Sequence, residues 1–559
     1  MNRRGPALAV GDVLGNGRDD VVIGGTTLDP LRVLGASGPG SYRAADAPPA
    51  PEKAAADDGP VLLFDAAGLG RADLIVTKGG NALPAGAQEY QPKLYLNDGK
   101  GGYREAPEGT LPALPINAGA VAAADFDHSG RLGLFLGGRF LPGNYPASPR
   151  SALLANRGGT FEDVTDTVAP GLREVGMVTG ALWSDVDGDG WPDLLVTLEW
   201  GNVRYFHNNK GRGFEDWTEK AGFASAGSGW WTSIAAADFN GDGRPDFVVG
   251  NVGLNTQYRA DPSHPALLFS GDFRGDHGTE LVEAYYEGDR LYPWRSRKVL
   301  GASIPSVLKR FTRTEPYARA TLGEILGEDR LAKARRYAAT ELRSGVFLSQ
   351  PDGTYRFEPL PRIAQISPLQ SVAAGYFEGD GHADIYAVQN SFAPIPSVGR
   401  FDGGLSQLLR GDGRGHFAAV PPAESGLVVP GDAKALAVID LGGEGWPGFL
   451  VTRNNSSALA FHNTGSARHR PLRIVLRGAP GNPTAVGARV TVELSDGSLE
   501  TAEVAAGSGT YSQSTAACFF GYPEGSPPRK ILVRWPSGET TGHAFPPGSV
   551  TLTLEGPAR

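Results

Sequence analysis

Short apolar runs alternate with loops rich in Asp and Gly along most of the chain. Residues 234–237 and 247–249, for example, are apolar runs on either side of such a loop. Runs of this length bounded by turn residues are typical of buried strands. A second kind of turn, rich in Asn, Asp and Gly, joins further apolar runs at 97–102 and 208–213, as in β-hairpins. The pattern therefore predicts four strands in each repeat of the sequence.

The Asp/Gly loop recurs seven times, with a spacing of 53 to 64 residues apart from one step of 138. A fixed period of this kind is the signature of a repeat architecture. Four strands per repeat predict an all-β fold, a seven-bladed β-propeller over residues 1–465, in which few sheet edges are exposed. The seven loops, numbered one to seven below, begin at Asp12, Asp65, Asp125, Asp185, Asp238, Tyr376 and Asp440.

The long step after loop five marks an insertion, residues 253–344, with a different pattern. Apolar residues recur at helical spacing over 305–311, 317–326 and 328–342, among many good helix formers. These three segments are predicted to be helices. Because the insertion follows the second strand of its repeat, we expect it to cover the propeller face opposite the Asp/Gly loops.

The last part of the chain, residues 470–559, leaves the repeat pattern. Its apolar and polar residues alternate, which is typical of half-buried strands. We therefore expect a separate C-terminal β-sandwich-like domain. Its predicted strands are residues 472–478, 486–494, 530–535 and 550–554.

Composition and charge narrow the function classes. The 559 residues carry a net charge of −9 without a basic run, which excludes nucleic-acid binding. No stretch approaches the ~20 apolar residues of a membrane span. The single Cys518 excludes an internal disulfide.

The N-terminal residues lack the apolar core of a signal peptide. The seventh repeat stops at its third strand, residues 458–462, whereas a propeller commonly closes by letting one terminus complete a blade begun by the other. We hypothesise that a strand and an export signal precede residue 1. The protein is then expected outside the cytoplasm, as a secreted, periplasmic or cell-surface protein.

Loops four and five, residues 185–193 and 238–246, have the composition of a cation site. Each places oxygen side chains at positions 1, 3, 5 and 9 and Gly at position 6. Many oxygen ligands in one sharply turned segment favour calcium, since magnesium prefers strict octahedral geometry and retains several waters. The alternative is an Asp/Gly turn without a metal, in which the carboxylates would repel one another. The predicted ligands are Asp185, Asp187, Asp189, Trp191, Asp193, Asp238, Asn240, Asp242, Arg244 and Asp246.

The other loops have fewer oxygen ligands. Loops two and seven are not expected to bind calcium, because Ala67 and Leu69, or Gly442 and Gly448, supply no side-chain oxygen. Loops one, three and six are intermediate. Their predicted ligands are Asp12, Asn16, Asp20, Asp125, Asp127, Ser129, Glu378, Asp380 and Asp384.

Two family resemblances rest on these motifs. The loops and their flanking strands resemble the FG-GAP (VCBS-type) repeat of the integrin α-subunit propeller. Residues 487–490 (GARV) and 535–538 (WPSG) resemble the ASPIC/UnbV domain found behind FG-GAP repeats in bacterial exported proteins and in cartilage acidic protein. The chain departs from that domain at residues 520–523. The resemblance implies a propeller followed by a β domain, and it implies no established activity for that domain.

No phosphate-binding loop, zinc-ligand spacing or nucleophile elbow is present in the sequence. Aromatic, amide and Arg side chains on the face opposite the loops suit a sugar or peptide ligand, although some of the rings could instead pack under the insertion. We interpret the chain as a calcium-binding module for adhesion to, or binding of, a glycan or protein ligand. The alternative is a hydrolase or oxidoreductase with its active site on the same face. The predicted ligand-binding residues are Arg139, Trp200, Trp230, Trp231, Asn251 and Asn255.

Overall fold

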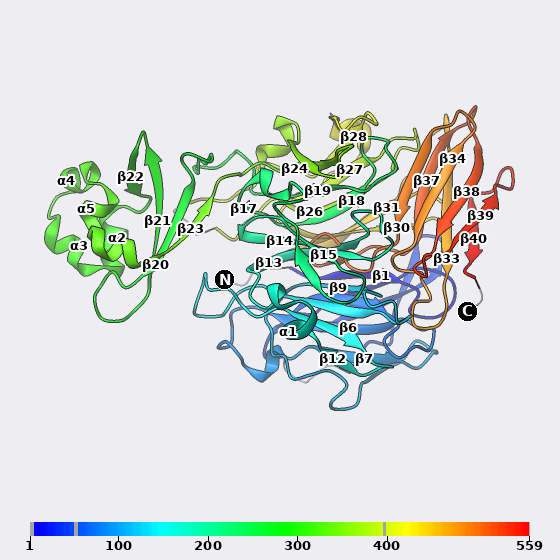
Figure 1. Cartoon of the computed structure of the whole chain (residues 1–559), viewed down its shortest axis with the longest axis horizontal. Coiled ribbons are helices and arrows are strands. Elements are labelled where there is room, and N and C mark those ends of the chain that lie inside the picture. Colours follow the sequence, from blue (N-terminus) through cyan, green and yellow to red (C-terminus); the bar gives the residue numbers. More distant parts are fainter. Residues whose placement is uncertain (1–4, 50–53, 395–397, 558–559) are drawn as a thin grey trace.

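The computed structural model describes residues 5–49, 54–394 and 398–557. Its strands form small, mainly antiparallel sheets that follow one another along the chain (Figure 1), and helices are few and short, which confirms the all-β class. Sheets one to three are β1 (Leu8–Gly11), β2 (Asp20–Ile23), β3 (Arg32–Gly38) and β4 (Ser41–Ala45); β5 (Asp57–Phe64), β6 (Asp73–Gly79), β7 (Lys93–Asn97) and β8 (Tyr103–Glu105); and β9 (Ala118–Ala124), β10 (Gly133–Gly138), β11 (Ala152–Asn156) and β12 (Phe161–Asp163).

Four further sheets repeat this order. Sheet four has an additional short strand, β17 (Gly229–Trp230), paired with its second strand. Sheets four to seven are β13 (Met177–Ser184), β14 (Asp193–Gly201), β15 (Arg204–Asn208) and β16 (Phe214–Asp216); β18 (Ile234–Ala237), β19 (Asp246–Val249), β24 (Gly345–Ser349) and β25 (Tyr355–Pro359); β26 (Leu369–Gly375), β27 (Asp384–Gln389), β28 (Gln407–Gly411) and β29 (Phe417–Val420); and β30 (Ala433–Ile439), β31 (Gly448–Arg453) and β32 (Ser456–Phe461). Two short helices, α1 (Thr165–Val168) and α7 (Pro422–Ser425), lie in connections.

The first strands of the seven sheets contact one another in a closed ring, β1–β5–β9–β13–β18–β26–β30 and back to β1. This is a propeller-like arrangement. Small residues make the close approach possible: β9 consists of Ala, Gly and Val, and every residue of it is buried. Each Asp/Gly loop joins the first and second strands of its sheet, so all seven loops lie at one end of the ring.

The insertion forms its own small unit between β19 and β24. It combines a four-stranded sheet with five short helices. It lies at the predicted end of the propeller, away from the C-terminal domain, but it extends outward from this end instead of covering it (Figure 1). The prediction of a helix through residue 342 is wrong beyond Lys333, because residues 335–339 pair with β20 as a strand. The elements are β20 (Ala266–Gly271), β21 (Glu280–Glu287), β22 (Arg290–Pro293), α2 (Arg297–Ser303), α3 (Pro305–Arg310), α4 (Thr314–Arg319), α5 (Leu322–Leu326), α6 (Glu328–Lys333) and β23 (Arg335–Ala339).

Two facing sheets make up the C-terminal domain, which lies at the opposite end of the molecule (Figure 1). The domain packs on the Asp/Gly loops: the backbone N–H of Gly481 donates to Asp65 at 2.8 Å, and the N–H of Thr501 donates to the Tyr376 hydroxyl at 2.8 Å. Its sheets have the orders β37–β33–β40 and β35–β34–β38–β39, from β33 (His469–Arg477), β34 (Arg489–Leu494), β35 (Leu499–Glu503), β37 (Cys518–Pro523), β38 (Pro528–Arg534), β39 (Thr540–Ala544) and β40 (Thr551–Glu555).

A segment of the C-terminal domain enters the centre of the ring. This axial plug, residues 505–515, includes the short strand β36 (Ser512–Gln513), which pairs in parallel with β1. The plug hydrogen-bonds to six of the seven sheets. Its contacts are Tyr511 O with Leu8 N, Gln513 with Leu63, Ala506 O with Ala123 N, Gly509 N with Ile234 O, Ser512 with Ser371, and Ser514 with Val438 N.

Gln513 makes two of these contacts with the backbone of one residue. Its side-chain oxygen accepts from the N–H of Leu63 at 2.7 Å, and its amide nitrogen donates to the carbonyl of Leu63 at 2.8 Å. The amide thereby replaces a neighbouring strand for the inner edge of β5. Sequence periodicity does not predict this contact, because the two residues are 450 positions apart.

Glu500 is a buried carboxyl on the side of the C-terminal domain that faces the propeller. Burial raises its pKa well above the ordinary value of 4.5, although the N–H of Gly521 donates to it at 3.2 Å. A folded-state pKa above the unfolded value means that stability falls as the pH rises from about 4.5 toward the folded-state pKa.

Replacing Glu500 by Gln is therefore expected to raise the melting temperature at about pH 8 and to leave it unchanged near pH 4, because the ionisation that burial disfavours is removed. Thermal unfolding at both pH values measures the effect. Glu539→Gln, at an exposed position, is the control. An equal shift of the Glu500→Gln protein at both pH values would contradict the assignment.

Candidate functional site

A cavity of about 740 Å³ lies on the propeller axis, at the end opposite the Asp/Gly loops. Four of its polar lining residues, Thr179, Thr232, Gln370 and Lys434, each precede the first residue of their loop by six positions. They come from sheets four to seven. Because equivalent positions of the ring strands lie at the same height around the axis, the four side chains form an arc. Sheets one to three have Pro6, Gly59 and Gly119 at this position.

The plug and the insertion complete this axial pocket. Thr510 and Tyr511 of the plug line it, as do Thr279 and Leu281 of the insertion. The C-terminal domain thus supplies part of a cavity at the far end of the propeller. The polar residue six positions before each of loops four to seven was the sequence signal that could have located the arc, but nothing in the repeat indicated the plug.

Arg139 and Glu199 form an ion pair in one wall of the pocket. The Tyr145 hydroxyl donates to Glu199 at 2.6 Å and accepts from the Trp200 indole N–H at 2.7 Å. Burial raises the pKa of Tyr145 well above its ordinary value, and the Glu199 charge adds to the effect. Tyr145 is therefore a neutral hydroxyl at physiological pH.

Lys434 is the second cation of the pocket. Its amino group is 2.7 Å from Asp432 and donates to the Gln370 side chain at 3.1 Å. Burial lowers the pKa of Lys434, while Asp432 opposes that shift. Each of the two cations of the pocket is thus matched by a carboxylate, so the pocket carries little net charge.

The predicted ligand-binding residues take different places. Arg139 lines the pocket. Trp200 and Trp230 meet edge to face at 5.0 Å, and Trp230 packs against Tyr258 at the base of the insertion at 4.9 Å. Trp231 is 0% exposed in the core between sheets four and five.

The two amides also make protein contacts. Asn251 is 0% exposed, and its amide donates to the carbonyl of Glu341 at 3.0 Å. Asn255 donates to the carbonyl of Ile366 at 3.1 Å. Of the six predicted residues, Arg139 alone lines the axial pocket. The others pack between the propeller and the insertion or, like Trp231, lie in the core of the propeller.

In the loops that carry Asp at position 9, this Asp has a constant environment. The Asp193 carboxylate accepts the backbone N–H of Val186 at 3.1 Å and of Asn208 at 2.7 Å. Asp20, Asp246 and Asp384 accept backbone N–H groups in the same way, and all four residues are 0% exposed. Burial raises the pKa of Asp193 to about 6 and that of Asp246 to about 7.

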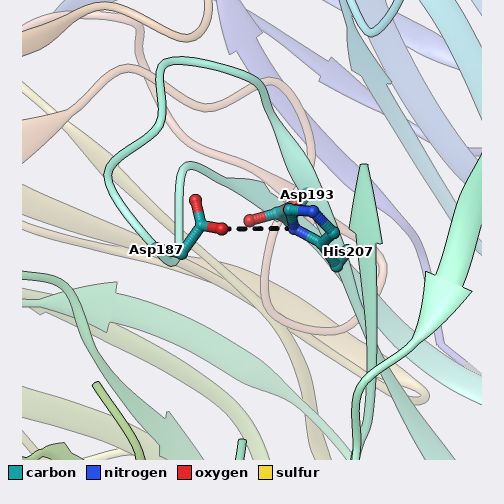
Figure 2. Close-up of side chains that lie close together, drawn as sticks. All are labelled: Asp187, Asp193 and His207. Carbon is teal, nitrogen blue, oxygen red and sulfur yellow. Dashed lines mark ion pairs between the residues drawn. The ribbon is translucent and has the colours of Figure 1, made fainter. Parts of the chain in front are cut away.

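Loop four gathers its acidic side chains. Carboxylate oxygens of Asp185, Asp187 and Asp189 lie within 4.8 Å of one another. Burial and the charge of Asp189 raise the pKa of Asp187. His207 of β15 joins this group, with its Nδ1 3.3 Å from both Asp187 and Asp193 (Figure 2). Such a cluster of oxygen donors fits a divalent cation.

Trp191 and His207 both stack on neighbouring rings. The Trp191 ring lies on His128 of loop three at a centroid distance of 3.6 Å, and the His207 ring lies on Trp217 at 3.7 Å. These stacks fix the outer part of loop four.

The C-terminal domain covers part of loop four. Arg534 forms an ion pair with Asp185, and Arg489 donates to the backbone carbonyl of Asp185 at 3.0 Å. The sequence analysis missed both residues. A cation in loop four would share the Asp185 carboxylate with Arg534.

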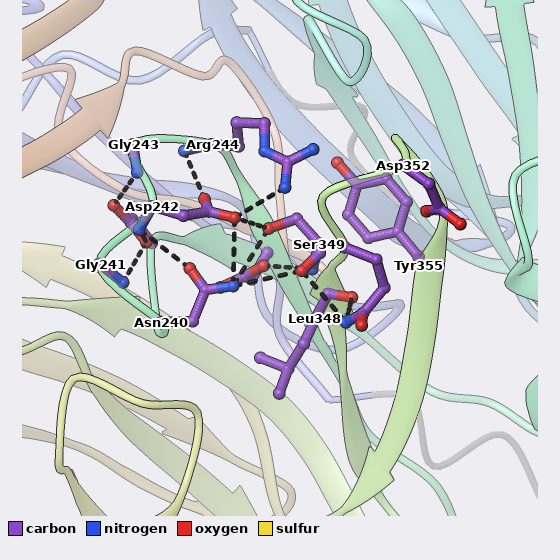
Figure 3. A network of polar contacts seen from close by, with 12 residues as sticks. Asn240, Gly241, Asp242, Gly243, Arg244, Leu348, Ser349, Asp352 and Tyr355 are labelled. Carbon is purple, nitrogen blue, oxygen red and sulfur yellow. Dashed lines mark hydrogen bonds and ion pairs between the residues drawn. The ribbon is translucent and has the colours of Figure 1, made fainter.

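The side chains of loop five form hydrogen bonds and ion pairs with neighbouring protein groups. Asp242 accepts the Ser349 hydroxyl at 2.6 Å and pairs with Arg244 at 2.8 Å, and Asn240 donates to Ser349 (Figure 3). Asp238 accepts the backbone N–H of Gly241 and Gly243, each at 2.8 Å. In the described part of the chain, loop four rather than loop five brings three or more acidic groups together.

The remaining predicted ligands make mainly local contacts. In loop one, Asp12 accepts backbone N–H groups of Asn16 and Gly17. In loop three, Asp125 accepts the N–H of Gly130, and Asp127 accepts that of Ser129 and pairs with Arg157 at 3.2 Å. In loop six, Glu378 pairs with Arg410, and Asp380 accepts the N–H of His382.

Over the whole chain, comparison with known proteins finds similarity only at low sequence identity. No curated protein matches it. Among solved structures, the V. cholerae biofilm matrix protein Bap1 has 10% identity and a TM-score of 0.29, and the match covers 83% of this chain and 88% of that one. Saccharomyces cerevisiae Sqt1 has 9% identity and a TM-score of 0.29, with 75% and 97% covered. A Bombyx mori β-fructofuranosidase has 9% identity and a TM-score of 0.27, with 93% of each chain covered. These likenesses are too distant to support a function.

Family models match two parts of the sequence. Residues 185–249 match the model described as an FG-GAP-like repeat, and residues 478–559 match the model described as ASPIC and UnbV. None of the helices in the described residues is long and apolar enough to cross a membrane. The chain therefore combines an FG-GAP-like repeat with a C-terminal ASPIC/UnbV domain, which confirms the architecture that the sequence motifs indicate.

Proposed function

We propose that this protein is an exported, calcium-binding β-propeller that acts as a binding or adhesion module, and that its ligand is a glycan held in the axial pocket. The arc of Thr179, Thr232, Gln370 and Lys434 at the mouth of the ring supports this proposal most directly. The cavity volume of about 740 Å³ lies within the range of roughly 300–1,000 Å³ that is usual for small-molecule sites.

The chemistry of the lining favours a neutral polyhydroxylated ligand. Hydroxyl and amide groups from Thr179, Thr232, Gln370 and Thr510 can both donate and accept hydrogen bonds. Because both cations already have carboxylate partners, an anionic ligand would have to displace Glu199 or Asp432. The alternative ligand is a protein. A surface loop of that protein would need to enter the same cavity.

In this proposal, calcium binds mainly to loop four. Asp185, Asp187 and Asp189 would hold the ion, and it would supply positive charge that offsets their mutual repulsion. Loop five is proposed as a weaker second site, because Asp242 already accepts hydrogen bonds from Ser349 and the backbone of Arg244. The ion would act on stability rather than on the ligand directly, since the loops lie at the other end of the ring from the pocket.

The lining of the pocket favours binding over catalysis. Glu199 is the one carboxylate among the lining residues, and its partners Arg139 and Tyr145 hold it in place. A hydrolase of the glycosidase type requires two carboxyl groups on either side of the scissile bond. The lining residues therefore support the binding module.

A glycan array with the full chain tests the proposal. We expect Gln370→Ala to weaken binding of the retained glycan by about twofold to tenfold, because one hydrogen bond contributes about 0.5 to 1.5 kcal/mol. Gln88→Ala, at an exposed position outside the pocket, should bind as the original protein does. Retention of no glycan by the original protein, or an equal loss in both variants, would contradict the pocket assignment.

A further inference from the structure

His207 occupies a repeat position that has no fixed residue type. It lies one residue before Asn208, whose backbone N–H donates to Asp193 at position 9 of loop four at 2.7 Å. A strand of this fold does not require a histidine at this position. The strand pairings place there, in the other six sheets, Gly35, Leu96, Ala155, Leu348, Arg410 and His462.

Sheet six shows what a cation at this position can do. Arg410 contacts Glu378, the carboxylate at position 3 of loop six, with Nη2 2.6 Å from Oε1. His207 faces the position-3 carboxylate of loop four from farther away, with Nδ1 3.3 Å from Asp187 Oδ2. The same Nδ1 is 3.3 Å from Asp193 Oδ1, and it has no hydrogen-bond partner among the described residues. The imidazole thus stands between two carboxylates without a hydrogen bond to either.

Neighbouring groups hold these three side chains in place. His207 is 8% exposed. The Tyr205 hydroxyl donates to Asp193 Oδ2 at 3.1 Å, and the backbone N–H of Asp189 donates to Asp187 Oδ1 at 3.1 Å. The other oxygen of each carboxylate therefore faces Nδ1 (Figure 2). Hydrogen bonds that orient a ligand from behind are typical of metal sites.

The distances suit an ion that forms short bonds. In a tetrahedral site with bonds of about 2.0 to 2.1 Å, which are typical of zinc with His and carboxylate ligands, neighbouring ligand atoms lie about 3.3 to 3.4 Å apart. The two distances from Nδ1 are 3.3 Å, and the three ligand atoms lie within 4.8 Å of one another. Calcium prefers oxygen ligands at about 2.3 to 2.6 Å, so an imidazole nitrogen favours a different ion.

We propose that His207, Asp187 and Asp193 form a binding site for a divalent transition ion of the zinc type. A neutral imidazole and two carboxylates match the charge of such an ion, and both kinds of group are usual zinc ligands. Three protein ligands leave the fourth position of a tetrahedral site to water. Because Asp187 is exposed, the ion can enter the site from solvent.

Asp187 also belongs to the proposed calcium ligands, with Asp185 and Asp189. The two ligand sets overlap, and two divalent ions so close together would repel each other. Each ion is therefore expected to weaken binding of the other. The inference rests on the proposed calcium site for this competition alone.

Isothermal calorimetry of the chelator-treated full chain with zinc chloride tests the site. We expect His207→Asn to weaken zinc binding by at least about 100-fold, because even the loss of a group that only orients a ligand costs about 10- to 100-fold. His462→Asn should bind zinc as the original protein does. His462 has the same repeat position, but Gly442 and Gly448 occupy positions 3 and 9 of its loop.

X-ray absorption at the zinc edge provides a readout that needs no variant, and it should show one imidazole bound to the ion. Three results would overturn the proposal: an original protein that binds no zinc, equal zinc binding by the His207→Asn protein, or bound zinc without an imidazole ligand.

Calcium separates this inference from the proposed calcium site. Calcium should still stabilise the His207→Asn protein, whereas Asp189→Ala should respond less to calcium and still bind zinc. Zinc binding through His207 in a protein that calcium does not stabilise would support this inference and contradict the calcium site alone. A His207→Asn protein that loses its response to both ions would overturn the assignment of separate ligand sets.

Discussion

Replacing Gln513 by Ala is expected to lower the free energy of unfolding by about 2 to 6 kcal/mol. The substitution leaves the N–H and the carbonyl of Leu63 without their partners, and each buried group without a hydrogen bond costs about 1 to 3 kcal/mol. Both groups lie inside the ring, where β5 is fully covered at this position. Urea unfolding followed by tryptophan fluorescence measures the change.

Gln88→Ala serves as the control, since Gln88 is exposed, and it should change stability by less than about 0.5 kcal/mol. If the axial plug holds the ring together, the Gln513→Ala protein should also lose hydrogen-exchange protection in β1 and β5. A Gln513→Ala protein as stable as the original would contradict a structural role of the plug.

Calcium at about 100 times its dissociation constant is expected to raise the free energy of unfolding by about 2.7 kcal/mol. The reason is that an ion bound only to the folded state compensates the repulsion among Asp185, Asp187 and Asp189. Dissociation constants of ~10⁻⁴ to 10⁻³ M are typical of extracellular modules. Asp187→Ala should remove most of the calcium-dependent increase in the free energy of unfolding. Asp242→Ala, in loop five, should remove a smaller part of it.

Isothermal calorimetry and urea unfolding, each with calcium and with chelator, measure these effects. Asp46→Ala, at an exposed position outside the loops, should respond to calcium as the original protein does. Chelation should reduce hydrogen-exchange protection mainly over residues 180–255. An unchanged stoichiometry in Asp187→Ala, or a uniform loss of protection along the chain, would argue against the assignment to loop four.

Local patterns in the sequence predicted much of the fold. The Asp/Gly loops, their flanking strands and the hairpins are all specified by residues within a few positions of one another. For the same reason the sequence predicted helix at α3, α5 and α6 of the insertion, although it missed α2 and joined the end of α4 to α5 as one helix. It failed at residues 335–339, because pairing with β20, which lies far away in the sequence, overrides a helical pattern there.

The candidate sites depended much more on contacts between distant residues. The sequence identified loop four as acidic, but the ion pair of Asp185 with Arg534 joins residues 349 positions apart. It assigned Trp231 to a ligand surface, whereas packing between sheets four and five makes this residue fully buried. A side chain can be placed on a strand by its own neighbours, but its burial depends on which strand packs against it.

The sequence by itself determined the repeat, the strand order and the composition of each loop, because these follow from short-range turn chemistry and the two-residue period of strands. Only the tertiary structure decided the path of the chain through the C-terminal domain. It places residues 505–515 in the centre of the ring and takes β33 away from sheet seven. Both choices rest on hydrogen bonds and apolar contacts between segments far apart in sequence, which no local pattern encodes.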